Sequence, residues 1–263
     1  GTKTRFCSRR RVVFNQKGGV GKSSIAVNLA AASAKCGLKT LLIDLDVQGN
    51  STHYIVGEQS EPLPGVEDFF QKQLSLYSRE PITALIHESA YSNLFIMPSG
   101  RGLLELEHKL ESRYKMYKLK EALAELMTDF DRIYLDTPPA LNFFSRSAMI
   151  AAERVVVPFD CDTFSKQALY QLTETIEEIK ADHNPQLVLE AIVPNQVPAR
   201  AKLPKQLIEG LKVDSLPVTK TTLSSSVVMR ESHEKAKPLV YLHAKHRLTQ
   251  EFEALLQELE SQS

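Results

Sequence analysis

Apolar runs of strand length alternate with helix-length segments along most of the chain, and this alternation constrains the fold more than any other feature. The runs LLIDLD and RVVVPF are almost continuously hydrophobic, which is typical of strands buried on both faces of a sheet. Strands that alternate with helices indicate a parallel sheet with crossover connections. The sequence therefore predicts a single α/β domain, whose mostly parallel, twisted sheet has helices on both faces.

The expected elements follow from these patterns. The expected strands are 11–15, 40–45, 93–97, 132–136, 154–158 and 187–193. The expected helices are 22–36, 102–111, 115–129, 144–152, 163–183, 202–212 and 244–260. The stretch 51–85 is less regular and holds Pro62, Pro64, Gly65 and Pro81, so we expect short helices and loops there rather than a second domain.

The composition supports one large domain. Of 263 residues, 43% are hydrophobic, which is enough for a substantial core. We expect a basic segment over residues 1–10 and the domain over residues 11–263. No apolar run reaches the roughly 18 residues of a membrane-spanning helix, and no export signal is visible. We therefore expect a soluble, cytoplasmic protein. Cys7, Cys36 and Cys161 are too widely spaced to indicate a disulfide framework or a metal site.

Charge is balanced overall, at 32 basic against 32 acidic residues, but it is unevenly distributed. Residues 1–43 carry nine Lys or Arg and no acid, and residues 198–247 carry ten basic and four acidic residues. The net charge thus says nothing about nucleic acid, although a local basic face is possible.

A strand, a glycine loop and a helix follow one another in VVFNQKGGVGKSS, residues 12–24. Glycines let backbone N–H groups surround phosphate oxygens, and the helix dipole adds attraction. Lys22 would reach the β- and γ-phosphates, and the Ser23 hydroxyl would ligate Mg²⁺. The usual GxxxxGK[ST] spacing is not met, because Gln16 stands where the first glycine is expected. An additional lysine, Lys17, lies at the mouth of the loop.

Three aspartates lie at strand ends. Asp136 ends an apolar strand at the carboxyl edge of the sheet, beside the phosphate loop, where it would hold Mg²⁺ through water. Asp44 and Asp46 are two residues apart at a strand end, so their side chains share a face and can approach the metal and the γ-phosphate. Acids at the end of a buried strand need a cation or solvent.

The segment KGGVGKSS resembles the deviant Walker A motif of the ParA/MinD family of P-loop ATPases. LLIDLDVQGNST is similar to the family's second motif, with Val47 replacing a proline, and IYLDTPPAL is similar to its Walker B region. Residues 148–161, 96–99 and 237–239 also match family segments. The resemblance covers nearly the whole chain and is strongest to the ParA (Soj-like) partition ATPases.

The resemblance implies an ATP- and Mg²⁺-dependent ATPase that forms a homodimer with ATP. Lys17 would reach the partner's phosphates, Asp46 would position or deprotonate the attacking water, and Asp44 would support the metal. Lys17, Lys22 and Asp46 are thus the expected catalytic residues. The expected nucleotide contacts are Lys17, Gly18, Gly19, Val20, Gly21, Lys22, Ser23 and Ser24, and the expected metal ligands are Ser23, Asp44 and Asp136. No arginine finger is identifiable, which indicates slow hydrolysis that a ParB-like or other adaptor accelerates.

The resemblance also implies base and DNA contacts. Asn195 stands where family members contact adenine, and Pro217 resembles the other wall of the base site. The segment ARAKL at 199–203 resembles a stretch whose arginine, here Arg200, binds DNA. Further basic residues could extend it into a stripe that contacts phosphates without reading bases. These are Lys202, Lys205, Lys220, Arg230, Lys235, Lys237, Lys245 and Arg247. A solvated basic helix face is the alternative interpretation.

Other functions remain open beside a nucleoid-associated ParA-type ATPase that positions a plasmid, a chromosome origin or a protein assembly. A MinD- or flagellar-positioning-type switch would bind a membrane when dimeric. The helix at 244–260 has an apolar face, but its polar side is acidic, which favours docking on the protein over a lipid surface. An electron-transfer relative such as the nitrogenase iron protein would need bridging cysteines, and Cys36 and Cys161 show no paired arrangement.

Overall fold

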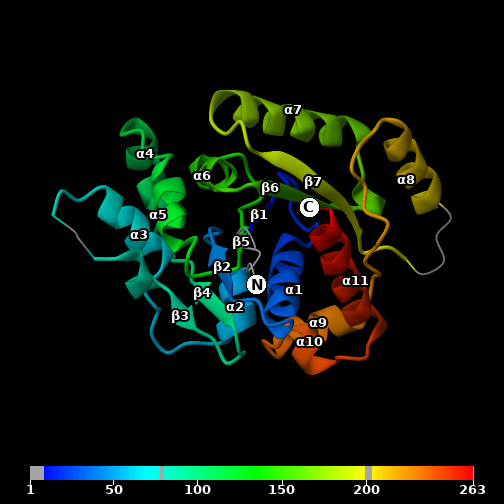
Figure 1. Cartoon of the computed structure of the whole chain (residues 1–263), viewed down its shortest axis with the longest axis horizontal. Coiled ribbons are helices and arrows are strands. Elements are labelled where there is room, and N and C mark those ends of the chain that lie inside the picture. Colours follow the sequence, from blue (N-terminus) through cyan, green and yellow to red (C-terminus); the bar gives the residue numbers. More distant parts are fainter. Residues whose placement is uncertain (1–8, 78–79, 199–202, 263) are drawn as a thin grey trace, which may run out of the picture.

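A sheet of seven strands forms the centre of the molecule (Figure 1). The computed structural model describes residues 9–77, 80–198 and 203–262. The strands are β1 (Arg9–Val13), β2 (Thr40–Asp44), β3 (His87–Glu88), β4 (Leu94–Met97), β5 (Arg132–Asp136), β6 (Arg154–Asp160) and β7 (Val188–Asn195). Their order is β3-β4-β2-β5-β1-β6-β7, and only the edge strand β3 pairs antiparallel. The predicted mostly parallel α/β sheet is confirmed.

Helices cover both faces of this sheet (Figure 1). They are α1 (Lys22–Lys35), α2 (Asn50–Val56), α3 (Val66–Gln73), α4 (Leu103–Ser112), α5 (Lys118–Leu126), α6 (Phe143–Ala151), α7 (Lys166–Asp182), α8 (Leu203–Val213), α9 (Val227–Glu234), α10 (Leu239–Leu242) and α11 (Arg247–Ser261), with 3-10 turns η1 (Ile82–Leu85) and η2 (Cys161–Thr163). The stretch 51–85 consists of short helices and loops, as predicted.

The hydrophobic core has two layers because successive strand residues point to opposite faces of the sheet. In β1, Val12 packs into the layer formed with α3 to α7, and Val13 packs into the layer formed with α1 and α9 to α11. Both valines are fully buried. A strand covered on both sides explains why the apolar runs are continuous rather than alternating.

Helix α11 covers the second layer of the core, and both salt bridges and apolar contacts hold it in place. The guanidinium of Arg11, fully buried in β1, donates to Glu190 and Glu260, both at 2.8 Å. Arg132 also donates to Glu260, at 2.6 Å. The helix buries its apolar face: Leu248, Phe252, Leu255, Leu256 and Leu259. The expectation that this helix docks on the protein is confirmed.

The structure differs from the sequence-based expectations at several boundaries. Strand β1 begins at Arg9, so Arg9 and Arg10 of the expected basic segment belong to the sheet. Strand β3 and helices α9 and α10 were not predicted, because segments this short carry little periodicity. Cys36 and Cys161 are free thiols. Within the described ranges, no helix is long and apolar enough to cross a membrane.

Candidate functional site

The loop between β1 and α1 adopts backbone conformations that require glycine. Gly19 and Gly21 have φ angles of +74° and +88°, in the left-handed region that favours glycine. A Cβ atom on Gly21 would lie 2.2 Å from Nδ2 of Asn195. The Asn195 side chain donates to the carbonyl of Val20 at 2.9 Å and so fixes the loop against the end of β7.

This loop leaves a group of backbone N–H donors free. Helices α6, α7 and α9 are each preceded by a capping residue, whose side chain accepts hydrogen bonds from first-turn N–H groups. These residues are Asn142, Ser165 and Ser226. Helix α1 begins after Gly21, which has no side chain to do so. Within the described residues, the N–H groups of 18–21 also donate to no protein acceptor. Such a group of donors at a helix N-terminus suits phosphate oxygens.

The two lysines of the loop lie in different environments. Lys22 is buried, and its Nζ donates to the carbonyl of Lys17 at 3.2 Å. Burial lowers the pKa of Lys22, and the nearby carboxylates of Asp136 and Asp46 oppose this shift. The Lys17 side chain is exposed and donates to the carbonyl of Thr163 in η2. Lys22 therefore lies inside the site, whereas Lys17 lies at its mouth.

Ser23 and Asp136 meet at the carboxyl edge of the sheet. The Ser23 hydroxyl donates to Oδ2 of Asp136 at 2.7 Å, and the Ser51 hydroxyl donates to the same oxygen. Oδ1 of Asp136 is buried and has no hydrogen-bond partner among the described residues. Burial raises the pKa of Asp136 to about 6. A free carboxylate oxygen beside a serine hydroxyl is a donor set that fits Mg²⁺.

Asp44 and Asp46 have separate surroundings. Oδ2 of Asp44 accepts from the N–H and hydroxyl of Thr52, at 2.9 and 2.8 Å, and Oδ1 accepts from the N–H of Asp46 at 3.1 Å. Burial and the neighbouring Asp136 raise the pKa of Asp44 to about 8. Asp46 lies two residues beyond the end of β2, so strand periodicity does not set its direction, contrary to our expectation. Its Oδ1 accepts from the N–H of Gln48 at 3.1 Å.

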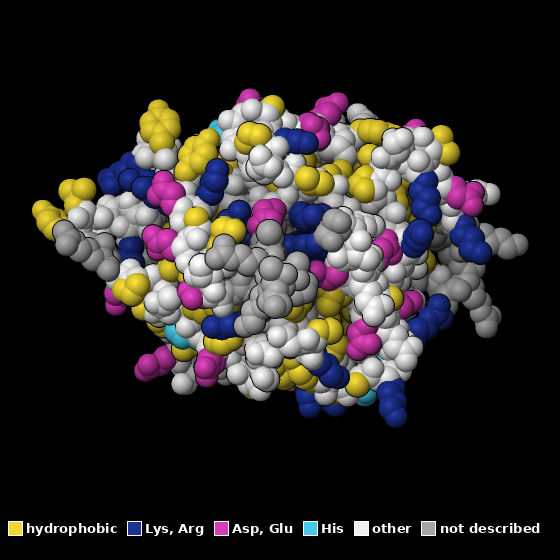
Figure 2. All heavy atoms as spheres, viewed as in Figure 1, with side chains coloured by type: hydrophobic (Ala, Val, Ile, Leu, Met, Phe, Trp, Pro, Cys, Tyr) yellow, Lys and Arg dark blue, Asp and Glu magenta, His cyan; other side chains and the backbone are white. Residues whose placement is uncertain are grey.

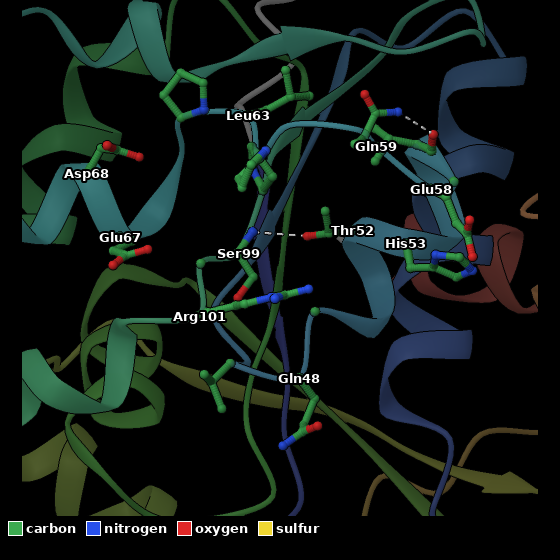
Figure 3. Close-up of a pocket in the computed structure, with 18 residues that line it drawn as sticks. Gln48, Thr52, His53, Glu58, Gln59, Leu63, Glu67, Asp68, Ser99 and Arg101 are labelled. Carbon is green, nitrogen blue, oxygen red and sulfur yellow. Dashed lines mark hydrogen bonds between the residues drawn. The ribbon is translucent and has the colours of Figure 1, made fainter.

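A cavity of about 700 Å³ lies beside this turn, between α2, α3 and the 98–101 loop (Figure 3). Ser99 on its wall donates through its N–H to Oγ1 of Thr52 at 2.9 Å (Figure 3). Thr52 in turn donates to Asp44, and the Ser99 hydroxyl donates to the carbonyl of Asp46. The cavity wall and the two carboxylate-bearing residues thus belong to one hydrogen-bond network.

Sequence reasoning missed three polar residues of the site. Ser51 and Thr52 lie in the QGNST segment at 48–52, so the motif that pointed to Asp44 and Asp46 could also have indicated these two residues. His233 on α9 had no local signal. Its Nε2 lies 2.7 Å from Oγ of Ser24, and burial, together with nearby His53, lowers the pKa of His233 to about 4.

The expected base and DNA contacts lie at the edge of the sheet and beyond it. The carbonyl of Pro217 accepts from the N–H of Ile192, which keeps it next to β7. Seven of the expected DNA contacts are exposed, and their segments lie on the side of the molecule that holds α8, α9 and α11 (Figure 1). They are Lys205, Lys220, Arg230, Lys235, Lys237, Lys245 and Arg247. Arg200 and Lys202 lie outside the described residues.

Known proteins are similar to this chain in sequence. A family model for an AAA domain matches residues 9–189. The chromosome partitioning protein ParA of Myxococcus xanthus is 30% identical over 249 residues, which are 94% of this chain and 86% of that protein. The chromosome-partitioning ATPase Soj of Thermus thermophilus is 32% identical over 258 residues, which are 95% and 97% of the two chains.

A solved structure extends the comparison to three dimensions. Cobyrinic acid a,c-diamide synthase from Mycobacterium smegmatis, with bound ATP analogue and magnesium, is 26% identical, with a TM-score of 0.82. The match covers 96% of this chain and 94% of that one. This chain belongs to the ParA/MinD-type family of P-loop ATPases, as its motifs indicated.

Proposed function

We propose that this chain binds ATP with Mg²⁺, hydrolyses it slowly, and uses the ATP-bound homodimer to hold DNA while it positions a cargo. The observation that supports nucleotide binding best is the free group of N–H donors at residues 18–21, next to the Ser23–Asp136 pair. The bound ATP analogue and magnesium in the synthase of the same fold also support it.

The residues would divide the chemistry as follows. Lys22 holds the β- and γ-phosphates, and its ammonium stabilises the charge that develops during transfer. Asp46 orients the attacking water or accepts its proton, and Ser24, held by His233, supports the α-phosphate side of the loop. Ser23 and Asp136 would hold Mg²⁺, with Asp44 behind them. When bound, this ion withdraws charge from the phosphate oxygens.

The ATP-dependent dimer is the proposed form that binds DNA. Lys17 would leave Thr163 and reach the partner's phosphates, and two monomers together double every backbone contact. Arg200, Lys202 and the exposed basic residues near α8, α9 and α11 would contact DNA phosphates without sequence preference. The ParA and Soj relatives are described as partition proteins, which supports this assignment.

A DNA-binding titration tests the proposal. Fluorescence anisotropy of two unrelated duplexes is measured over a salt series with ATP or ADP. If about three phosphates are neutralised per monomer, the log–log salt slope of the dimer should be near −5, and Arg200→Ala should reduce its magnitude by about two. Lys109→Ala, on α4 at the other end of the molecule, should leave the slope unchanged. Equal affinity with ADP and ATP, or preference for one duplex, would contradict the proposal.

The stimulating partner and the cargo are proposed by class only: a ParB-like or other adaptor, and a plasmid, chromosome origin or protein assembly. The alternative of a membrane switch receives no support from α11. Its apolar face is part of the core, so insertion into lipid would require the helix to leave Arg11 and Arg132.

A further inference from the structure

Exposed apolar side chains gather at the end of the molecule formed by α3, α4 and α5. Leu76 and Tyr77, which follow α3, are 93% and 91% exposed, and Tyr114, in the turn between α4 and α5, is 80% exposed. Nη1 of Arg113 donates to the carbonyl of Leu74 at 3.3 Å, which joins that turn to the chain after α3. Figure 2 shows hydrophobic side chains projecting here beside a group of Lys and Arg.

We call the surface formed by Leu76, Tyr77, Arg113, Tyr114 and Lys115 the α4–α5 turn surface. Residues 109–120 hold five Lys or Arg and one acid, so the surface lies in a basic part of the chain. Among the described residues, neither Arg113 nor Lys115 forms an ion pair with a carboxylate, whereas Lys118 pairs with Glu121. Two cations are therefore available to a negatively charged partner.

Tyr114 occupies a backbone conformation that does not suit it. Its φ is +56°, and it follows α4 at the position where helices commonly end with glycine. The N–H of Lys115 donates to Leu110 and that of Tyr114 donates to Glu111, both at 3.0 Å, which is the hydrogen-bond pattern of that ending. A residue other than glycine costs about 1 kcal/mol there. The exposed ring recovers little of this through packing, which indicates a use outside the fold.

We propose that the α4–α5 turn surface binds an acidic, partly apolar segment of a protein partner. Tyrosine and arginine are among the residues that contribute most to protein interfaces when a partner covers them. Carboxylates of the partner would meet Arg113 and Lys115, and its apolar side chains would cover Tyr114, Leu76 and Tyr77. This proposal does not depend on DNA binding or hydrolysis.

The observations favour a protein over nucleic acid, and binding to lipid is an outcome of the test below. Leu76 is aliphatic and offers nothing to a phosphate backbone. The basic residues proposed for DNA lie on the other side of the molecule, around α8, α9 and α11 (Figure 1). Glu80, Glu111 and Glu121 are exposed near this surface, but each is paired with a basic residue, so they do not pair with Arg113 or Lys115.

A peptide selection on the full chain tests the proposal. Random short peptides are displayed and selected for binding to the protein. The selected peptides, called the winners below, are then titrated against variants of the protein. We expect the winners to combine Asp or Glu with apolar residues. Tyr114→Gly and Lys115→Glu should each weaken their binding at least about ten-fold. Val213→Ser, which removes an equally exposed side chain on α8, should leave binding unchanged.

Thermal unfolding of the variants and binding to two alternative ligands, duplex DNA and lipid vesicles, complete the experiment. Tyr114→Gly should unfold at the same temperature as the parent or higher, since glycine suits the φ angle, so its loss of binding is not a folding defect. Winners that are neutral or basic, the absence of winners, or equal binding to Tyr114→Gly would each overturn the proposal. It would also be overturned if Lys115→Glu weakened binding to duplex DNA or to phosphatidylserine-containing vesicles but not to the peptides.

Discussion

Two obstacles stand against the replacement of Gly21, one steric and one in the backbone. Any other residue would meet Asn195 and would also adopt an unfavourable φ of +88°. We expect Gly21→Ala to lower the free energy of unfolding by about 1–3 kcal/mol and to abolish ATP binding, because the loop must move. Gly18→Ala is the matched control, since its Cβ meets nothing within 4 Å and no positive φ is required. Thermal unfolding without nucleotide measures the stability of the two variants, and a titration with ATP measures their affinity. Equal stability of Gly21→Ala and Gly18→Ala would contradict this account.

At the same scale, the phosphate loop and its carboxylates were predictable because their motifs are contiguous in the sequence. The contacts that complete the site were not. Ser51 and Asp136 are 85 residues apart, and Ser24 and His233 are 209 residues apart. Such pairs depend on how distant elements pack, which no local pattern encodes. Asn195 illustrates the difference: its position was expected beside the nucleotide, but its hydrogen bond to Val20 was not.

Among the elements, α11 makes the clearest prediction about pH. Burial alone would raise the pKa of Glu260, but Arg132 and Arg11 outweigh burial and lower it to about 2. Because the unfolded chain takes up this proton at a higher pH, Glu260 stabilises the fold above about pH 4.5, and this contribution is lost as the pH falls toward 2.

We therefore expect Glu260→Gln to be less stable than the parent by about 1–2 kcal/mol at pH 7, and the difference to disappear near pH 2. The figure is below that for a fully buried pair because 24% of the Glu260 side chain is exposed and solvent screens its charge. Chemical denaturation at several pH values measures the difference. Glu253→Gln, on the exposed side of the same helix, should show none; a pH-independent difference for Glu260→Gln would refute the assignment.

Long periodic elements were predicted within a few residues, whereas β3, α9 and α10, which are short, were not predicted. Helix α7 was expected at 163–183 and spans Lys166–Asp182, because its apolar positions repeat over several turns. Strand β3 has two residues and α10 has four, so neither contains a full repeat. Their existence follows from the sheet edge and from α1, against which they pack, and not from their own composition.

For the whole molecule, the proposed ATP-dependent dimer leads to a prediction about Lys17. Lys17 donates to the carbonyl of Thr163 in its own chain, so in the proposed dimer it would exchange this carbonyl for the partner's phosphates. Light scattering after size exclusion should show a monomer without nucleotide and a dimer with ATP in an Asp46→Ala background, where we expect hydrolysis to be blocked. Adding Lys17→Ala should keep ATP binding but prevent the dimer. Full dimerisation of that double variant would exclude Lys17 as the link.

The ion pairs of Arg11 also determine when β1 can complete its packing during synthesis of the chain. Arg11 belongs to the first strand of the sheet, yet its partner Glu260 is made 249 residues later. A ribosome adds about 5–20 residues per second, so roughly 12–50 s separate the synthesis of the two. During that interval, β1 cannot take its final place without burying a charge that still lacks one partner. Strand β1, although made before the other described strands, therefore completes its packing only when α11 has emerged.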